Sequence, residues 1–289
     1  MFFNTMSSHF IIIFGFSLVF ASFVNGVYED DVNFDQNYVP LWANNHITRL
    51  YNGTEVQLLL DQSSGTGFRS ISDYGSGRFG MRMKLPDKNT SGIVTSFYLT
   101  SAPVGSQPGN HDELDFEFIG SSTLLQTNVF ADDSGGREER YQLWFDPRKD
   151  FHLYEILWNQ YLVVFYVDGV PVRVFKNYKD KGVNYISNPM NIQATIWSAP
   201  WAGPVNWKEA PFISSYRRFG IDGCVSQSTS IDPKCLSPGL PWNVQKDLSP
   251  REQIMHQEFR KKNVVYDYCL DKARQQHHPE CLLPHIPPD

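Results

Sequence analysis

Residues 111–120 read HDELDFEFIG, in which acidic and apolar side chains alternate. This alternation has the period of a β-strand, whose successive side chains point to opposite faces of a sheet. Glu113, Asp115 and Glu117 therefore share one face, and the leucine and phenylalanines that alternate with them share the other. The pattern predicts a sheet that buries its apolar face and carries three carboxylates on an open, concave face.

Acidic residues on the solvated face of an antiparallel strand are common and need no function. Three like charges in one row are harder to explain, because same-face neighbours about 7 Å apart repel one another without a gain in stability. Cleavage of a glycosidic bond, by contrast, uses one carboxylate as nucleophile or base and a second as acid. We therefore interpret the row as catalytic.

The outer two carboxylates must be brought together by curvature of the sheet. Retention of configuration needs the two groups about 5–5.5 Å apart, whereas Glu113 and Glu117 would be roughly 13 Å apart along a flat strand. A concave sheet tips their side chains toward each other. Asp115 can then hydrogen-bond to the nucleophile and help keep Glu117 protonated until the leaving oxygen needs a proton.

Short apolar–polar alternations run from about residue 54 to 220 and favour an all-β sandwich or jelly roll. A chain of 289 residues is long enough to bury one such core. Asp168-Gly169 predicts a tight hairpin, and Pro171 places the returning strand at an edge or at its first residue. Strands are expected at 55–60, 78–84, 92–99, 162–167 and 170–175, and glycine-rich turns at 65–67, 75–77 and 134–136.

The region after residue 220 differs in character and is predicted to be an extension packed on the sandwich. Proline and serine dominate residues 226–250. A helix is expected over 250–259 with Ser249 as its cap, and residues 262–269 read as a strand. The extension is not expected to fold alone.

Residues 9–26 form an apolar run followed by an acidic stretch, which is typical of a secretory signal peptide. No lysine or arginine precedes the run, so an uncleaved anchor is the alternative, although a membrane span needs about 20 apolar residues. The protein is expected to be secreted and free of the membrane after cleavage. The predicted boundaries are 1–26 for the signal peptide, 27–220 for the catalytic domain and 221–289 for the extension.

The formal net charge is −6, and no dense run of lysine or arginine occurs, so nucleic acid is not expected as a partner. Aromatic residues make up 15% of the chain, which is more than core packing usually needs. Some of them are expected to line a groove.

All four cysteines lie in the last quarter of the chain: Cys224, Cys235, Cys269 and Cys281. An even number in an exported chain predicts two disulfides, and the spacings do not fit zinc ligands, which are the alternative. The first cysteine is expected to pair with the second and the third with the fourth, because each pair closes a short loop. Asn52 and Asn89 begin candidate N-glycosylation sequons.

The acidic strand resembles the signature of glycoside hydrolase family 16, specifically that of the plant xyloglucan endotransglucosylase/hydrolases. The resemblance covers about residues 30 to 281. It implies a concanavalin-like β-jelly roll with a concave substrate cleft and a disulfide-stapled C-terminal extension. Further similar blocks are LQTNVF at 125–130, REER at 137–140, LWFDP at 143–147, ILWN at 156–159, FYVDG at 165–169, APF at 210–212, DGC at 222–224 and YDYC at 266–269.

The resemblance also implies the chemistry. Glu113 would be the nucleophile that forms a glucosyl-enzyme ester, Glu117 the acid/base, and Asp115 the assisting residue. The mechanism would require neither cofactor nor metal. The partners would be xyloglucan polymer and oligosaccharide acceptors in the cell wall or apoplast, with the enzyme a monomer.

Carry-over by position assigns the substrate contacts. Gln126 and Asn128 would face the cleft near the scissile sugar, Tyr98 and Arg140 the acceptor side, and Trp197 and Trp201 the donor side. Tryptophan and tyrosine stack on sugar faces, and glutamine and asparagine bond hydroxyls in pairs. Trp144 and Trp158 are expected in the core instead.

Three features depart from relatives of the fold. Residues 120–124 are short and lack the asparagine of a sequon that family members usually carry there, and residues 197–204 abbreviate a donor-side loop, so donor preference can differ. The Glu-x-Asp-x-Glu spacing, one residue shorter than in laminarinase-type relatives, predicts an unbulged strand. Such a strand favours a cleft open enough for a branched substrate.

Several functions remain compatible with these observations. A carbohydrate-binding lectin could use the same sandwich and aromatic groove, although it would not need three aligned acids. Within the enzymes, an endohydrolase of xyloglucan or mixed β-glucan is the alternative to a transferase. Transfer is expected to outweigh hydrolysis, because a well-positioned acceptor hydroxyl can compete with water at about 55 M.

Overall fold

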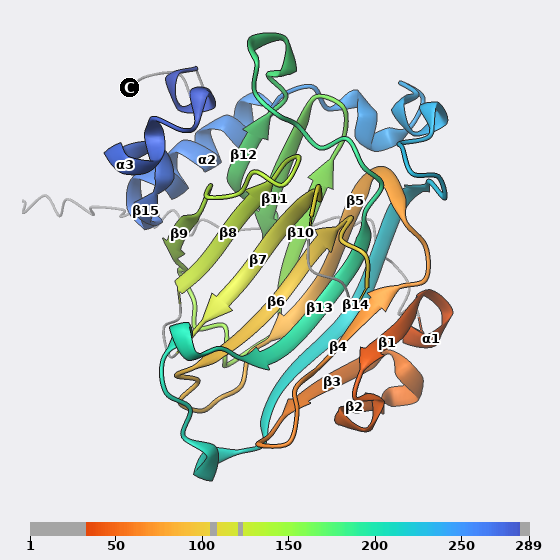
Figure 1. The fold of residues 1–289 in the computed structure, drawn as a ribbon, viewed down its shortest axis with the longest axis vertical. Helices are drawn as coiled ribbons and strands as arrows, with labels where there is room; N and C mark the ends of the chain where they lie inside the picture. Colours follow the sequence, from red (N-terminus) through yellow and green to blue (C-terminus); the bar gives the residue numbers. More distant parts are fainter. Residues whose placement is uncertain (1–32, 105–108, 121–123, 284–289) are drawn as a thin grey trace, which may run out of the picture.

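The computed structural model describes residues 33–104, 109–120 and 124–283 and shows two antiparallel β-sheets packed face to face (Figure 1). The prediction of an all-β sandwich is confirmed. The predicted signal peptide at 1–26 and the middle of the short segment 120–124 lie outside the described residues. Within the described part of the chain, no helix has the length and apolar character that crossing a membrane requires.

The first sheet has eight strands, with the acidic strand β7 near its middle. In spatial order they are β1 (Tyr38–Trp42), β4 (Thr66–Ser70), β13 (Asn191–Ser198), β6 (Ile93–Thr100), β7 (Glu113–Ile119), β8 (Leu124–Phe130), β9 (Glu139–Gln142) and β15 (Val264–Asp267). Figure 1 shows the N-terminal and C-terminal strands at opposite ends of the sandwich. The extension therefore supplies one edge of the sheet that carries the acids.

The second sheet has seven strands and includes the predicted hairpin. In spatial order they are β12 (Val170–Lys176), β11 (Leu162–Val167), β10 (His152–Trp158), β5 (Tyr74–Lys84), β14 (Phe212–Val225), β3 (Glu55–Leu60) and β2 (Ile47–Leu50). Asp168 and Gly169 join β11 to β12 with φ of 46° and 75°, the positive values that a tight hairpin turn requires. β12 is an edge strand, as Pro171 predicts, because proline has no N–H for a further neighbour.

The α-helices of the described residues are α1 (Phe34–Asn37), α2 (Pro250–Asn263) and α3 (Lys272–Gln275). Ser249 caps α2 as predicted: its side chain accepts from the Glu252 N–H, and the Glu252 carboxylate accepts from the Ser249 N–H at 2.8 Å. The helix continues four residues beyond its predicted end, so the predicted strand at 262–269 begins too early. Basic residues at 260–262 suit the negative end of the helix dipole.

The core lies between the two sheets. Leu114, Phe116 and Phe118 of β7 point into it and are at most 3% exposed. Phe116 packs edge-on against Tyr154 and Phe165 of the second sheet, with ring centroids 5.6 and 5.2 Å away. The predicted apolar face of β7 is thus confirmed, and the acidic face is turned away from the core.

The two tryptophans that were expected in the core differ in their exposure to solvent. Trp158 is 1% exposed, as expected, but Trp144 is 49% exposed, so its prediction is wrong. Trp144 follows β9 and packs edge-on against Phe259 of α2, with centroids 5.8 Å apart. It therefore lies on the outer surface where the extension meets the sandwich.

Of the expected glycine-rich turns, the one at 75–77 lies inside a strand, and the one at 65–67 extends into the start of a strand. Gly67 is in β4, and the segment 75–77 is in β5. A Cβ on Gly77 would come within 2.4 Å of the Phe79 ring and 2.8 Å of the Cα of Gly223 on β14. These glycines permit close packing within the sheet instead of a change in chain direction.

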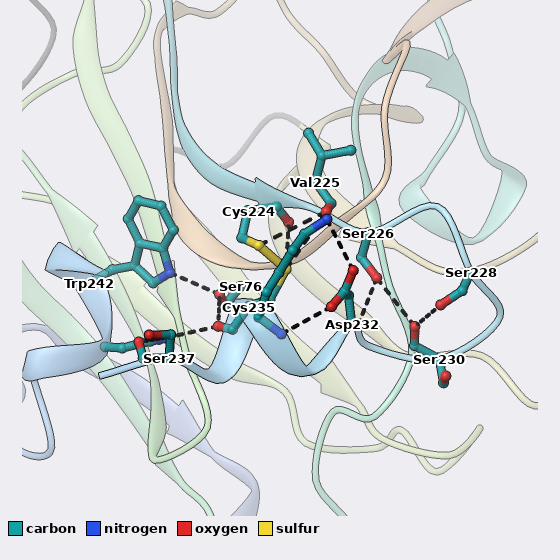
Figure 2. Close-up of a disulfide and its surroundings, with 12 residues drawn as sticks. Ser76, Cys224, Val225, Ser226, Ser228, Ser230, Asp232, Cys235, Ser237 and Trp242 are labelled. Carbon is teal, nitrogen blue, oxygen red and sulfur yellow. Dashed lines mark hydrogen bonds and ion pairs between the residues drawn. A yellow bond between two sulfur atoms is a disulfide. The ribbon is translucent and has the colours of Figure 1, made fainter. Parts of the chain in front are cut away.

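Both predicted disulfides, Cys224–Cys235 and Cys269–Cys281, are present, which excludes the zinc alternative. The first joins the end of β14 to the start of the extension (Figure 2). Beside it, the Ser76 hydroxyl donates to the Cys235 carbonyl at 2.6 Å and accepts from the Trp242 indole N–H at 2.8 Å. The extension is therefore anchored on β5 and β14 at this point.

Buried charges anchor the rest of the extension. Glu139 of β9 contacts Arg173 of β12 at 3.3 Å and Arg260 of α2, and Arg260 also pairs with Asp267 of β15. Burial raises the pKa of Glu139, but the charges of Arg260 and Arg173 outweigh this effect and lower the pKa to about 2. Loss of one partner would leave a buried charge uncompensated, so the extension and the sandwich depend on each other.

Candidate active site

The strand β7 presents its three acids without a break in register. On one side it pairs with β6, from Glu113 opposite Thr100 to Ile119 opposite Val94. On the other side it pairs with β8, from Glu113 opposite Phe130 to Phe118 opposite Leu125. Neither pairing contains a shift in register. The prediction of an unbulged strand is confirmed. Because the alternate residues fill the core, Glu113, Asp115 and Glu117 all face the open side of the eight-stranded sheet.

Two hollows meet at these acids. A hollow of about 610 Å³ is lined by Glu113, Asp115, Glu117, Ile119, Leu124, Gln126, Asn128, Phe130, Glu138, Arg140, Trp201 and Ala202. A second, of about 380 Å³, is lined by the same three acids with Trp42, Ser96, Tyr98, Thr195 and Trp197. The hollows form one groove across the sheet, with the carboxylates at its middle.

Asp115 and Glu113 share a hydrogen bond at the middle of the groove. Burial and the charges of Glu113 and Glu117 raise the pKa of Asp115 well above its usual range, which favours its protonated form as the donor of the hydrogen bond to Glu113. Burial also raises the pKa of Glu113, while the bonds from Thr100 and Asp115 and the nearby His111 lower it. The expected hydrogen bond between these two acids is thus present.

Glu117 lies on the other side of Asp115 and is bound by Gln126, whose amide donates to Glu117 Oε2 at 2.8 Å. Burial raises the pKa of Glu117, and the charges of Glu113 and Glu138 raise it further, against the effects of Gln126 and Arg140. Since like carboxylates in a dry site cannot all ionise together, one stays protonated while another is negative. This arrangement can supply both an acid and a nucleophile.

The burial of Asp115 predicts a pH-dependent stability. Its pKa is raised above the ordinary 3.8, so its protonated form stabilises the fold below about that pH, and this contribution is lost as the pH rises through the raised pKa. An asparagine amide at this position would be neutral at every pH. We expect Asp115→Asn to increase the free energy of unfolding at pH 7 and to increase it less near pH 3. Urea unfolding at pH 7 and near pH 3 measures this, and an equal gain at both would contradict it.

Gln126 and Asn128 both line the larger hollow, but their polar groups are largely engaged. Gln126 bonds Glu117 through its amide nitrogen and Arg140 through its oxygen at 2.8 Å. The Asn128 oxygen accepts from the N–H groups of Val129 and Arg137 at 2.9 and 3.1 Å. The Asn128 oxygen is therefore held by the backbone at the wall of the larger hollow.

Tyr98 lies directly across from Asp115 on β6. Its hydroxyl donates to Gln193 at 2.6 Å, and Gln193 in turn donates to Asn191 at 2.8 Å. The orientation of Tyr98 is thereby fixed, and its hydroxyl can still accept a hydrogen bond from a sugar.

The predicted substrate residues all line the groove. Tyr98 and Trp197 line one hollow, while Arg140 and Trp201 line the other, across the acidic strand. The assignment of Tyr98 and Arg140 to the acceptor side and of both tryptophans to the donor side stays a prediction. The two tryptophans still touch edge-on at 6.0 Å, because Trp201 reaches over from the end of β13.

Directly opposed residues form one row across all eight strands. Each neighbour in the row is the other's cross-strand partner: Trp42, Gly67, Thr195, Ser96, Glu117, Gln126, Arg140 and Tyr266. We call these residues the cross-strand row. It places an aromatic residue at each end of the sheet and Glu117 near its middle.

Trp42 and Glu138 line the groove but were not expected from the sequence. Trp42 is 41% exposed and lies against Gly67, where a Cβ would approach its ring to 3.0 Å. The glycine thus leaves room for the indole to lie on the sheet. The contact between Trp42 and Gly67 follows from the pairing of β1 with β4. The local sequence around either residue does not predict it.

Within the described residues, no group of three or more His, Cys, Asp or Glu side chains is arranged to hold a metal ion. The groove is lined instead by carboxylates, amides and indoles. Such a lining suits a neutral polymer rich in hydroxyl groups.

Two family models match the chain. Residues 34–212 match the model described as "Glycosyl hydrolases family 16", and residues 237–281 match "Xyloglucan endo-transglycosylase (XET) C-terminus". Together they cover both the sandwich and the extension.

Curated relatives extend over most of the chain. "Xyloglucan endotransglucosylase/hydrolase protein 3" of Arabidopsis thaliana is 45% identical over 267 residues, which are 88% of this chain and 90% of the relative. "Xyloglucan endotransglucosylase protein 34" of Populus tremula x Populus tremuloides is 46% identical over 274 residues, 90% of this chain and 88% of the relative.

Solved structures match over the sandwich. A prokaryotic beta-1,3-1,4-glucanase (lichenase) derived from a mouse hindgut metagenome has a TM-score of 0.54 and 27% identity, covering 65% of this chain and 93% of that one. The beta-glucanase of Bacillus licheniformis has a TM-score of 0.54 and 25% identity, covering 66% and 92%.

Proposed function

The chain belongs to glycosyl hydrolase family 16 and, within it, to the xyloglucan endotransglucosylase/hydrolases, and on this premise we propose that it cleaves the backbone of xyloglucan and transfers the new end to another xyloglucan chain. One observation above all supports this: Glu113, Asp115 and Glu117 meet at the middle of one groove, where burial raises the pKa of each carboxyl and Asp115 hydrogen-bonds to Glu113.

In the first step Glu113 acts as nucleophile. Its ionised carboxylate attacks the anomeric carbon of the glucose at the cleavage point, and the bond from that carbon to the leaving oxygen breaks as Glu117 gives this oxygen its proton. The products are a glucosyl ester on Glu113 and a free chain with a new hydroxyl. Asp115 assists by donating its hydrogen bond to Glu113 and holding the carboxylate in place.

In the second step Glu117, now ionised, acts as base. It takes the proton from an incoming hydroxyl, whose oxygen attacks the anomeric carbon and displaces Glu113. Two inversions leave the β-configuration unchanged. When the hydroxyl belongs to a sugar the result is transfer, and when it belongs to water the result is hydrolysis, so the balance depends on how well the groove holds an acceptor.

Aromatic and amide side chains of the groove supply the sugar contacts. Trp197 and Trp201 offer exposed ring faces, and Trp42 extends the line of rings to the far edge of the sheet. Stacking on such rings buries the apolar face of a sugar while its hydroxyls bond the polar neighbours. Asn128 and Tyr98 are held in fixed positions beside the acids.

The location belongs to the same proposal. A signal peptide at 1–26 would send the protein to the cell wall or apoplast, where the two disulfides persist in an oxidising medium. Residues 27–220 would form the catalytic domain and 221–289 the extension, of a monomer. Asn52 and Asn89 are exposed and open to glycosylation.

An assay with labelled acceptor tests the function. The purified protein is incubated with xyloglucan, with and without labelled xyloglucan oligosaccharide, and polymer size and reducing ends are followed. We expect label to enter long polymer with little growth of reducing ends, because an acceptor seated in the groove competes with water.

Other outcomes separate the alternatives. Steady release of reducing ends at a rate that acceptor does not change would identify an endohydrolase. Binding of xyloglucan without any change in polymer size would identify a lectin.

A further inference from the structure

The extension reaches the larger hollow at two places. Tyr266 of β15 lies opposite Arg140 of β9, with the guanidinium carbon 5.3 Å from its ring centroid. Arg274 of α3 lies 3.6 Å from the carboxylate of Glu138, which also lines the hollow. One aromatic and one cationic side chain of the extension therefore act on two charged residues beside Glu117.

The contact at Tyr266 continues to Glu117 along the cross-strand row. Arg140 Nε donates to Gln126 Oε1 at 2.8 Å, and Gln126 Nε2 donates to Glu117 Oε2 at 2.8 Å. Arginine has only donors, so the oxygen of the Gln126 amide must face Arg140 and its nitrogen must face Glu117. Arg140 thereby decides which end of the amide the Glu117 carboxylate meets.

Local contacts hold Tyr266 in turn. Its hydroxyl donates to Asp271 Oδ2 at 3.0 Å, while Asp271 Oδ1 caps α3 by accepting from the Ala273 N–H at 3.0 Å. The disulfide Cys269–Cys281 closes the loop that contains α3. The ring under Arg140 is thus held by contacts within the extension, in addition to the pairing of β15 with β9.

We infer that the extension is part of the catalytic apparatus: Tyr266, through Arg140 and Gln126, orients the carboxyl of Glu117 and sets the charge around it. Tyr266, Arg140 and Gln126 are positioning residues in this scheme, which rests on the proposed role of Glu117 as acid/base. The extension would thereby take part in proton transfer in addition to any contact with sugar.

The effect on Glu117 has a definite sign. The titratable and charged groups that face it are Glu113 and Asp115 on its own strand, Tyr98 on β6, and Glu138 and Arg140 from the side of β9. Its neighbours Ser96 and Gln126 are uncharged. Burial, Glu113 and Glu138 favour the protonated form, whereas Gln126 and Arg140 favour the ionised form. Loss of the positioning residues must therefore make Glu117 hold its proton more tightly.

The test is a carboxyl ¹³C NMR titration of the full chain without substrate, with the Glu117 signal assigned through Glu117→Gln. At a fixed pH we expect the ratio of ionised to protonated Glu117 to fall roughly tenfold in Arg140→Met, which loses a charge and a hydrogen bond. In Tyr266→Leu, which loses only the ring contact, we expect a fall of about threefold.

Matched variants control for other causes. Tyr266→Phe keeps the ring and should titrate close to wild type. Arg251→Met removes one positive charge at the exposed start of α2 and should leave Glu117 unchanged. Near-ultraviolet circular dichroism of each variant reports whether the extension is still docked. Should Tyr266→Leu fail to fold, Tyr266→Met, whose longer and more flexible side chain can adapt to the space of the ring, replaces it in the same titration.

The outcomes separate this inference from the proposed function. A wild-type titration of Glu117 in folded Tyr266→Leu would overturn the inference, whatever Arg140→Met does. If the titration shifts as expected but the alkaline limb of kcat/KM on xyloglucan does not move with it, the positioning contacts stand and the assignment of Glu117 as acid fails.

Discussion

Glu113→Ala should lose activity on xyloglucan by roughly ten-thousand-fold or more and leave the fold intact. The methyl group cannot form the ester, so both steps of the double displacement are lost. The fold should survive because Glu113 faces the groove at the first residue of β7, and its removal relieves repulsion among three acids. Initial rates, together with thermal unfolding of the same preparation, measure both parts.

A small anion provides the control for this variant. Azide can enter the space left by the carboxylate and attack the anomeric carbon of an activated donor from the same face, which yields an α-glycosyl azide. Formation of that product shows that the groove and Glu117 are still in place. Residual turnover above about a hundredth of wild type would refute Glu113 as the nucleophile.

Glu117→Ala should lose activity according to the leaving group of the donor. On xyloglucan, whose leaving hydroxyl needs a proton, we expect a loss of about a thousandfold or more. A donor with a very good leaving group needs no proton, so its first step should be almost unchanged. The second step still lacks its base, and the glucosyl-enzyme should accumulate, which intact-protein mass spectrometry detects.

Glu138→Gln is a useful comparison for Glu117→Ala, because Glu138 lines the same hollow and is assigned no proton transfer. It should show no such dependence on the leaving group. If Glu117→Ala instead loses activated and natural donors to the same extent, the acid/base assignment is wrong.

Local sequence patterns predicted the features that depend on neighbouring residues. The period of two in residues 111–120 fixes which side chains of β7 face the core, and the structure agrees. The Asp168-Gly169 hairpin and the capping of α2 by Ser249 likewise depend on a few adjacent residues. The disulfides were predictable because each closes a short loop.

Features that depend on distant strands were not predictable in this way. The cross-strand row joins eight strands whose pairing no local pattern records. Gly67 reads as a turn residue until Trp42 is seen to lie on it. Trp144 was expected in the core, yet the extension, not the second sheet, packs beside it.

The pairing of β15 with β9 at the edge of the eight-stranded sheet has a consequence for biosynthesis. A ribosome delivers β1 first among the described strands and β15 after all the others, so the edge at β9 stays unpaired until residue 267 has emerged. During that interval the edge can recruit strands of other chains, a risk that the pairing of β15 removes. A polypeptide truncated by a premature stop codon before residue 264 would retain all three acids and lack Tyr266, and unpaired β9 would mark it for degradation.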